Sequence, residues 1–160
     1  MMETRDLLEI GRSLVGAGRY GEAIRIYRKV IQREPDHVHS LDVLGFLYYM
    51  TNDFETALQM CERSLAVDAD SFYAQKGYGL CLVKAGRIED GLAALHRSIE
   101  LNPDYYDSRH DLGVTLLELE RWDEARDAFE GARRVEPGRA GEIDQALKTL
   151  ANRRAASKNS

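Results

Sequence analysis

Apolar residues recur along this chain at the spacing of an α-helix, and the arrangement returns at a fixed interval. In the stretch from Leu112 to Pro137, two apolar runs with intervals of three and four residues flank a short polar turn, and a proline closes the unit. Steps of 34 residues along the chain find the same residue type at Gly11, Gly45, Gly79 and Gly113. This period predicts an array of helix-turn-helix repeats.

Four repeats are predicted, over about residues 4–37, 38–71, 72–105 and 106–138, beginning near Thr4, Val38, Phe72 and Tyr106. Pro35 and Pro103 are expected to stop the second helix of their repeats, because proline cannot continue a helix. Ala69 stands at that place in the second repeat. Asp36 and Asp70 are expected to cap the helix that follows, since a carboxylate can accept bonds from its free amides.

The first repeat has Gly16-Ala17-Gly18 at its turn, where the end of the helix favours a residue with positive φ. The second repeat has Asn52-Asp53 at its turn, and the third has Gly86. The fourth turn, Glu120-Arg121, lacks the usual glycine, so we expect it to be strained or capped differently. The four repeated glycines are expected to let the paired helices approach closely, by facing the small residues Ala23, Ala57, Gly91 and Ala125.

After Pro137 the pattern changes to a mostly polar helix, predicted over about residues 139–155. Its apolar residues are Ile143, Leu147 and Leu150, and their spacing suits a helix that covers the exposed apolar face of the last repeat. Residues 4–155 are therefore expected to form a single domain. The polar tail, residues 156–160, is expected to fray.

Composition and charge exclude several classes of protein. Of the 160 residues, 44% are hydrophobic and 31% charged, which suits a folded chain rather than a disordered one. The net charge of −5 argues against nucleic-acid binding, which needs a dense basic face. The N-terminal residues lack the pattern of a signal peptide, and no apolar run approaches the ~20 residues that span a bilayer. We therefore expect a cytoplasmic protein without membrane insertion.

Residue types that carry chemistry are scattered. Cys61 and Cys81 both lie in apolar helical patterns, so two reduced core thiols are favoured over a disulfide or a metal site. Gly16, Gly18 and Gly21 spell GxGxxG, but they follow a helix instead of a strand and so contain only the interhelical turn. The histidines lie at His37, His39, His96 and His110, without metal-ligand spacing. We predict no enzyme, cofactor or metal site.

The order of residue types in each unit closely resembles the tetratricopeptide repeat (TPR). In the fourth unit these residues are Gly113, Ala125, Phe129, Ala132 and Pro137. Departures from the family pattern are Cys61 in place of an aromatic, Ala69 in place of proline, and Gln75 and Arg109 at positions that are usually apolar. The resemblance implies an all-α fold, a right-handed α-solenoid of four hairpins with a C-terminal capping helix. It also implies a concave groove, lined by the first helix of each repeat, that holds a peptide or another protein.

Helical register identifies first-helix residues that do not face the partner helix and are therefore expected in the groove. The middle of this set is apolar and aromatic, with arginine at one end and carboxylates at the other, and part of it is expected to pack between repeats. The predicted partner-binding residues are Arg12, His39, Asp42, Phe46, Tyr49, Met50, Tyr73, Lys76, Leu80, Val83, Lys84, His110, Asp111, Val114 and Leu117.

These observations favour a non-catalytic scaffold or adaptor that binds a protein or peptide partner in the groove. An exposed apolar patch of this extent is typical of a binding surface. Two alternatives stay open. One is a chaperone-like holder of a single client protein, for which no residue discriminates. The other is a self-assembling repeat module that forms homo-oligomers.

Overall fold

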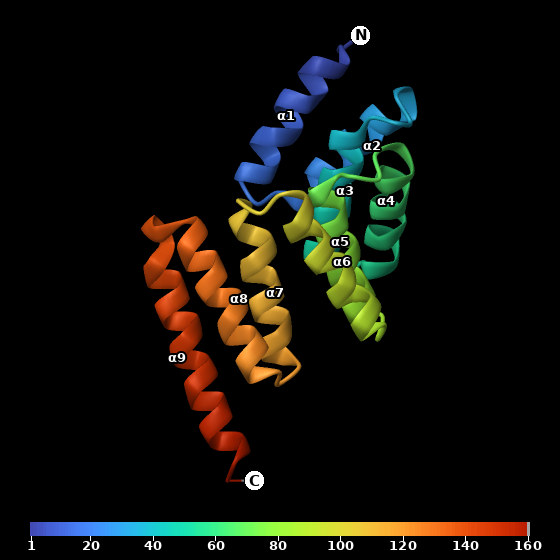
Figure 1. Ribbon diagram of the computed structural model, residues 1–160. Helices are drawn as coiled ribbons and strands as arrows, with labels where there is room; N and C mark the ends of the chain where they lie inside the picture. The colour runs from blue at the N-terminus through green and yellow to red at the C-terminus, as the bar shows by residue number, and fades with distance from the viewer. Residues whose placement is uncertain (160) are drawn as a thin grey trace. The chain divides into compact units, whose positions relative to one another are not determined.

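The computed structural model describes residues 1–159, and within that range the chain forms nine α-helices, a short 3-10 helix and no strand (Figure 1). The predicted all-α class is confirmed. The helices are α1 (Thr4–Gly16), α2 (Tyr20–Arg33), α3 (Val38–Met50), α4 (Phe54–Val67), α5 (Phe72–Lys84), α6 (Ile88–Leu101), α7 (Tyr106–Glu118), α8 (Trp122–Val135) and α9 (Ala140–Ser157), with η1 (Pro137–Arg139) before α9.

The helices fall into two compact units, residues 1–101 and 102–160. The first unit holds α1 to α6, and the second holds α7 to α9. Helices α1, α3, α5 and α7 begin at the four residues that the 34-residue period singles out, and each packs against the helix that follows it. A single domain over residues 4–155 stays a prediction.

The turn inside each repeat has the same backbone conformation in all four. One residue per turn has positive φ, and these residues are 34 positions apart: Gly18 (70°), Asn52 (63°), Gly86 (81°) and Glu120 (58°). The next residue donates its N–H to a carbonyl five positions earlier at 2.8–2.9 Å, which satisfies one of the free carbonyls at the helix end. The strain predicted for the fourth turn is confirmed, because Glu120 adopts a conformation that favours glycine.

The predicted caps at Asp36 and Asp70 are wrong by one residue. His37 Nδ1 accepts the N–H of Ser40 at 3.2 Å, and Ser71 Oγ accepts the N–H of Ala74 at 3.1 Å. The capping side chain belongs to the residue directly before the first helical one, and both aspartates lie one position further from the helix.

The predicted partners of the four glycines are corrected in the first and fourth hairpins, and in part in the second, where the Ala57 carbonyl oxygen does lie 3.7 Å from a Cβ built on Gly45. The atoms nearest to a Cβ built on the glycine belong to the residue 16 positions later, which is Tyr27 for Gly11, Cys61 for Gly45 and Phe129 for Gly113. These side chains are larger than the alanines one turn earlier and reach into the space that the glycine leaves. In the third hairpin the expected pair does meet, since a Cβ on Gly79 would lie 2.7 Å from the carbonyl oxygen of Gly91.

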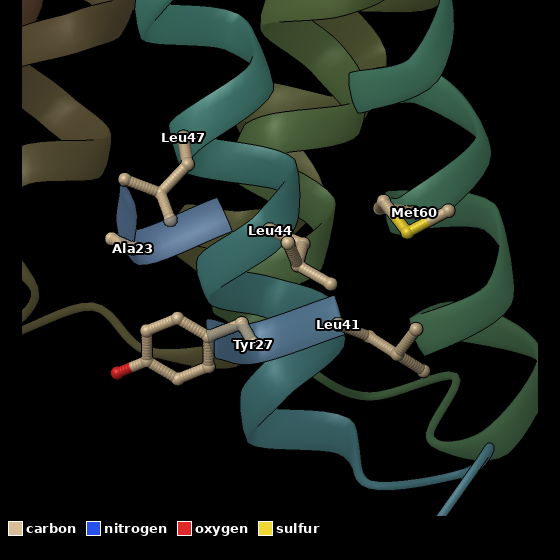
Figure 2. Close-up of a cluster of buried hydrophobic side chains, with 6 residues drawn as sticks. All are labelled: Ala23, Tyr27, Leu41, Leu44, Leu47 and Met60. Atoms are coloured by element: carbon tan, nitrogen blue, oxygen red, sulfur yellow. The ribbon is translucent and has the colours of Figure 1, made fainter. Parts of the chain in front are cut away.

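A cluster of fully buried side chains joins the first repeat to the second. Figure 2 shows Ala23 and Tyr27 of α2 beside three leucines of α3, with Met60 of α4 on the other side of that helix. Each of these side chains is at most 8% exposed, so α3 is covered on two faces. The leucines are Leu41, Leu44 and Leu47.

Helix α9 packs against α8, as the sequence pattern suggests. Ile143 and Leu150 are buried, and Leu147 is half-buried. The ion pairs Arg133–Asp144 and Arg154–Asp123 also join the two helices. The helix extends to Ser157, so the first two residues of the predicted frayed tail are helical, while residue 160 lies outside the described range.

Replacing Gly79 with alanine is expected to destabilise the protein by about 2–3 kcal/mol, because the new Cβ would overlap backbone atoms of α6 that cannot rotate away. Gly21→Ala is the matched control, since Gly21 is helical and exposed with nothing within 4 Å. There alanine should stabilise by up to about 1 kcal/mol. Urea unfolding of both variants measures this. Equal effects at the two positions would contradict the close approach of α5 and α6.

Replacing Glu120 with glycine should stabilise the protein by about 0.5–1 kcal/mol. The left-handed backbone costs a residue with a Cβ about 1–2 kcal/mol, and the greater freedom of unfolded glycine offsets part of the gain. Asn52→Gly should give less, because asparagine tolerates this conformation. Thermal unfolding of the two variants compares them directly. A loss of stability in Glu120→Gly would show that the side chain makes a compensating contact.

Candidate functional site

Six of the predicted groove residues meet around one hollow between α3 and α5 of the first unit. Asp42, Phe46 and Tyr49 follow one another at intervals of four and three on α3, so they share one face of that helix. The same argument places the α5 residues on one face. We name this surface the α3–α5 patch, and it consists of Asp42, Phe46, Tyr49, Tyr73, Lys76 and Leu80.

The cavity under the patch is small, with a volume of about 30 Å³. That is room for about one water molecule, far below the several hundred Å³ of a typical small-molecule site. Gly45, Ala74, Gly77 and Cys61 complete its lining. A Cβ on either glycine would lie 2.9 Å from the Cys61 Sγ, so the glycines make room for the sulfur. The hollow therefore has room only for the tip of one side chain of a larger partner.

The two cysteines are free thiols, and both are buried, as the sequence predicts. The pKa of the Cys61 thiol is raised far above its usual range by its hydrogen bond with Cys81 and by burial. Cys61 is thus a protonated packing group at neutral pH.

Asp42 is the half-buried charge of the patch. Ser64 Oγ, which is fully buried on α4, donates to Oδ1 of Asp42 at 2.6 Å. Burial raises the Asp42 pKa to about 6, the hydrogen bond from Ser64 opposes that rise, and the charge of Asp68 adds to it. The carboxyl is therefore mostly ionised at neutral pH.

The other predicted groove residues of the first unit have different surroundings. Arg12 lines a separate hollow with Arg5 and Glu9. The His39 ring lies edge-on to Tyr27, with centroids 6.4 Å apart, and Met50 is 45% exposed. Lys84 is exposed at the end of α5.

Val83 and Leu117 pack partly or wholly against neighbouring helices, and their role in partner binding stays a prediction. A Cβ on Gly91 would lie 2.6 Å from Val83 Cγ2, so part of the Val83 side chain contacts α6. Leu117 is only 7% exposed and offers little surface. Helical register alone cannot tell whether a side chain points into the groove or towards a neighbouring helix, because that depends on the angle at which the helices cross.

In the second unit, His110 packs inward. Its ring stacks on Tyr106 with centroids 5.5 Å apart and lies edge-on to Phe129 at 6.0 Å, while Nδ1 is 3.6 Å from a carboxylate oxygen of Asp111. Val114 is half-buried. That these residues bind a partner stays a prediction.

Sequence reasoning missed Ser64 and the contribution of Cys61 to the patch. The substitution of Cys61 for the aromatic of the repeat pattern is the one signal that pointed here. A second hollow, of about 600 Å³, was also missed; polar and charged residues of α2 and α4 dominate its lining, among them Arg28, Gln32, Thr56 and Arg63.

No helix in residues 1–159 is both long and apolar enough to cross a membrane. The same residues contain no group of three or more side chains that could hold a metal ion. A cytoplasmic location stays a prediction.

Paired helices that repeat every 34 residues place this chain in the class of helical repeat proteins. Comparison with known families agrees. A family model described as "Tetratricopeptide repeat" matches residues 14–81, and another TPR model, described as "Anaphase-promoting complex, cyclosome, subunit 3", matches residues 50–132. The chain belongs to the tetratricopeptide repeat family, as the sequence resemblance indicates.

Individual relatives are distant. A peroxisomal targeting signal receptor of Eremothecium gossypii is 30% identical over 82 residues, which is 51% of this chain and 14% of the receptor. The structure of a thermophilic TPR protein of Thermus thermophilus matches with a TM-score of 0.83 at 20% identity, covering 92% of this chain and 81% of that one. The TPR solenoid fold class is thereby confirmed.

An enzyme is also among the structural neighbours. An O-GlcNAc transferase of Thermobaculum terrenum matches with a TM-score of 0.74 at 26% identity, covering 84% of this chain and 27% of that one. This chain therefore spans only a minor part of that enzyme and about a seventh of the curated receptor. The TPR fold typically serves as a non-catalytic scaffold, and it also occurs within larger catalytic chains.

Asp42→Asn is expected to stabilise the protein at about pH 7.5 by about 1 kcal/mol, a value reduced for partial exposure to solvent. The pKa of Asp42 is higher in the folded chain than in the unfolded one, so this residue lowers stability as pH rises from about 4 to about 6. The gain in Asp42→Asn should accordingly vanish near pH 4. Urea unfolding at both pH values checks this. A gain of the same size at both would rule out ionisation as its cause.

Proposed function

We propose that the chain is a non-catalytic protein-interaction module that binds an extended or helical segment of a partner protein at the α3–α5 patch. The observation that carries this proposal is the patch itself, in which four partly exposed apolar side chains surround a hollow with an ionised carboxylate. A hollow of this size admits the tip of one side chain of a segment, while the apolar side chains around it contact neighbouring residues of that segment.

The free energy gained by covering the apolar side chains of the patch limits how tightly such a segment binds. The side chains Phe46, Tyr49, Tyr73 and Leu80 are already half-buried. Covering each one fully therefore gains less than about 1 kcal/mol instead of ~2. The total of at most about 3 kcal/mol is below the smallest cost of association, which is about 4 kcal/mol. Apolar contact alone is not enough for stable binding, so polar groups of the patch must contribute.

The relatives support a role in recognition. The receptor of Eremothecium gossypii is by name a receptor for a targeting signal, and the shared segment covers 51% of this chain.

The two alternative functions, a chaperone-like holder of one client and a self-assembling module, make different predictions. A dedicated holder would suppress aggregation of a client at equal molar ratio, and a self-assembling module would gain mass with concentration in light scattering.

Selection from a random peptide library displayed on phage tests the proposal. The wild-type chain should enrich peptides that bind weakly, with dissociation constants of about 1 mM, which a polar contribution of about 4 kcal/mol beyond the apolar contacts would give. In the double variant Phe46→Asp and Leu80→Asp, binding of the enriched peptides should fall below detection, because two charges would enter the apolar contact.

Ile10→Asp is the matched control, because Ile10 is a 40% exposed apolar residue on α1 outside the patch. Circular dichroism verifies that all variants keep their helices. Peptides that bind the double variant as tightly as wild type would locate binding elsewhere, and the hollow between α2 and α4 would be the next surface to test.

A further inference from the structure

The patch contains a carboxylate whose charge the protein leaves uncompensated. Burying an ionised group is unfavourable unless it is paired with an opposite charge or fully hydrogen-bonded. Asp42 has the hydroxyl of Ser64 at 2.6 Å, and no cationic side chain forms an ion pair with it within residues 1–159. Replacing such a group by a neutral one usually makes a protein more stable, so its presence calls for a role.

The groups around Asp42 come from three helices. On α4 and at its end lie Ser64, Cys61 and Asp68, which are neutral or negative. On α3 itself, one turn earlier, lies His39, whose pKa is lowered chiefly by burial, so that it is uncharged at neutral pH. None of these groups supplies a positive charge.

Lys76 is the cation on α5 that lines the same hollow. Its Nζ lies over the ring of Tyr73, 5.3 Å from the centroid, and it does not contribute to the pKa of Asp42. The lysine therefore interacts with the aromatic part of the patch, and the carboxylate faces the hollow without it.

We infer that the partner segment carries a lysine or arginine whose cation pairs with Asp42 while a neighbouring apolar side chain contacts Phe46 and Leu80. This inference rests on the proposed function and specifies the chemistry of its partner. It follows from charge complementarity, because a bound cation would supply what the fold lacks. A charge-assisted hydrogen bond would also supply the polar contribution that apolar contact at the patch requires.

Spacing along α3 sets the spacing in the partner. Phe46 and Tyr49 lie four and seven residues after Asp42, which is about 6 and 10 Å along the helix axis. An extended segment advances about 3.3 Å per residue, so its basic residue should stand two or three positions from the apolar one. An acidic residue at the basic position should be excluded, because it would meet the charge of Asp42 in a site that Asp68 already makes more negative.

An array of synthetic peptides tests the inference. Each peptide carries one leucine or phenylalanine, with lysine, arginine, glutamine or glutamate two or three positions away. At about pH 7.5 the wild-type chain should bind the lysine and arginine peptides about tenfold more tightly than the glutamine peptides. The glutamate peptides should bind weakest. In Asp42→Asn this preference should disappear, with the glutamine peptides bound as before.

Asp36→Asn is the matched control, because it removes the same charge from an exposed residue that does not line the hollow. It should keep the tenfold preference. Lowering the pH to about 5 should shrink the preference in wild type and in Asp36→Asn, since Asp42 then becomes protonated, and should leave Asp42→Asn unchanged.

The outcomes separate this inference from the proposed function. If apolar peptides bind and the double variant Phe46→Asp and Leu80→Asp abolishes binding, but Asp42→Asn keeps the preference for basic residues, the inference is wrong and the proposed function stands. If binding is indifferent to the double variant, both are wrong. An equal affinity for lysine and glutamine peptides would likewise overturn the inference alone.

Discussion

The close approach of paired helices is the constraint on which the other features of the structure depend. In each hairpin a glycine of the first helix lies against the residue 16 positions later, and that residue is Tyr27, Cys61, Leu95 or Phe129. A methyl group at any of these glycines would lie within 3.0 Å of that partner. The pairing fixes how far one helix can slide along the other, so it also fixes which residues face outward.

The outward-facing residues of α3 and α5 acquire their properties from that packing. Cys61 is small enough to lie between Gly45 and Gly77, and α5 can therefore come close to α3. The same geometry brings Ser64 to Asp42 and half-buries the carboxylate. Stability and recognition conflict at this point, since the charge that weakens the fold is the one available to a partner.

Much of the fold was accessible from sequence because local rules determine it. The 34-residue period located the starts of α3, α5 and α7, and the missing glycine at Glu120 indicated the strained turn. The caps were misplaced by one residue, because the capping residue is defined by its backbone conformation rather than its type. Val83, Leu117 and the contact between Ser64 and Asp42 depend on how helices cross, which no single-helix pattern contains.

The Cys61 sulfur occupies the space that a Cβ would need on Gly45 and on Gly77, two glycines of successive hairpins. The second and third hairpins consequently behave as a matched pair and are not interchangeable modules. The first and fourth hairpins carry Tyr27 and Phe129 at the place of Cys61, and neither contacts a glycine of a following hairpin among those described. Repeat proteins ordinarily tolerate exchange, duplication or deletion of single units. In this chain the junction between α4 and α5 limits such changes.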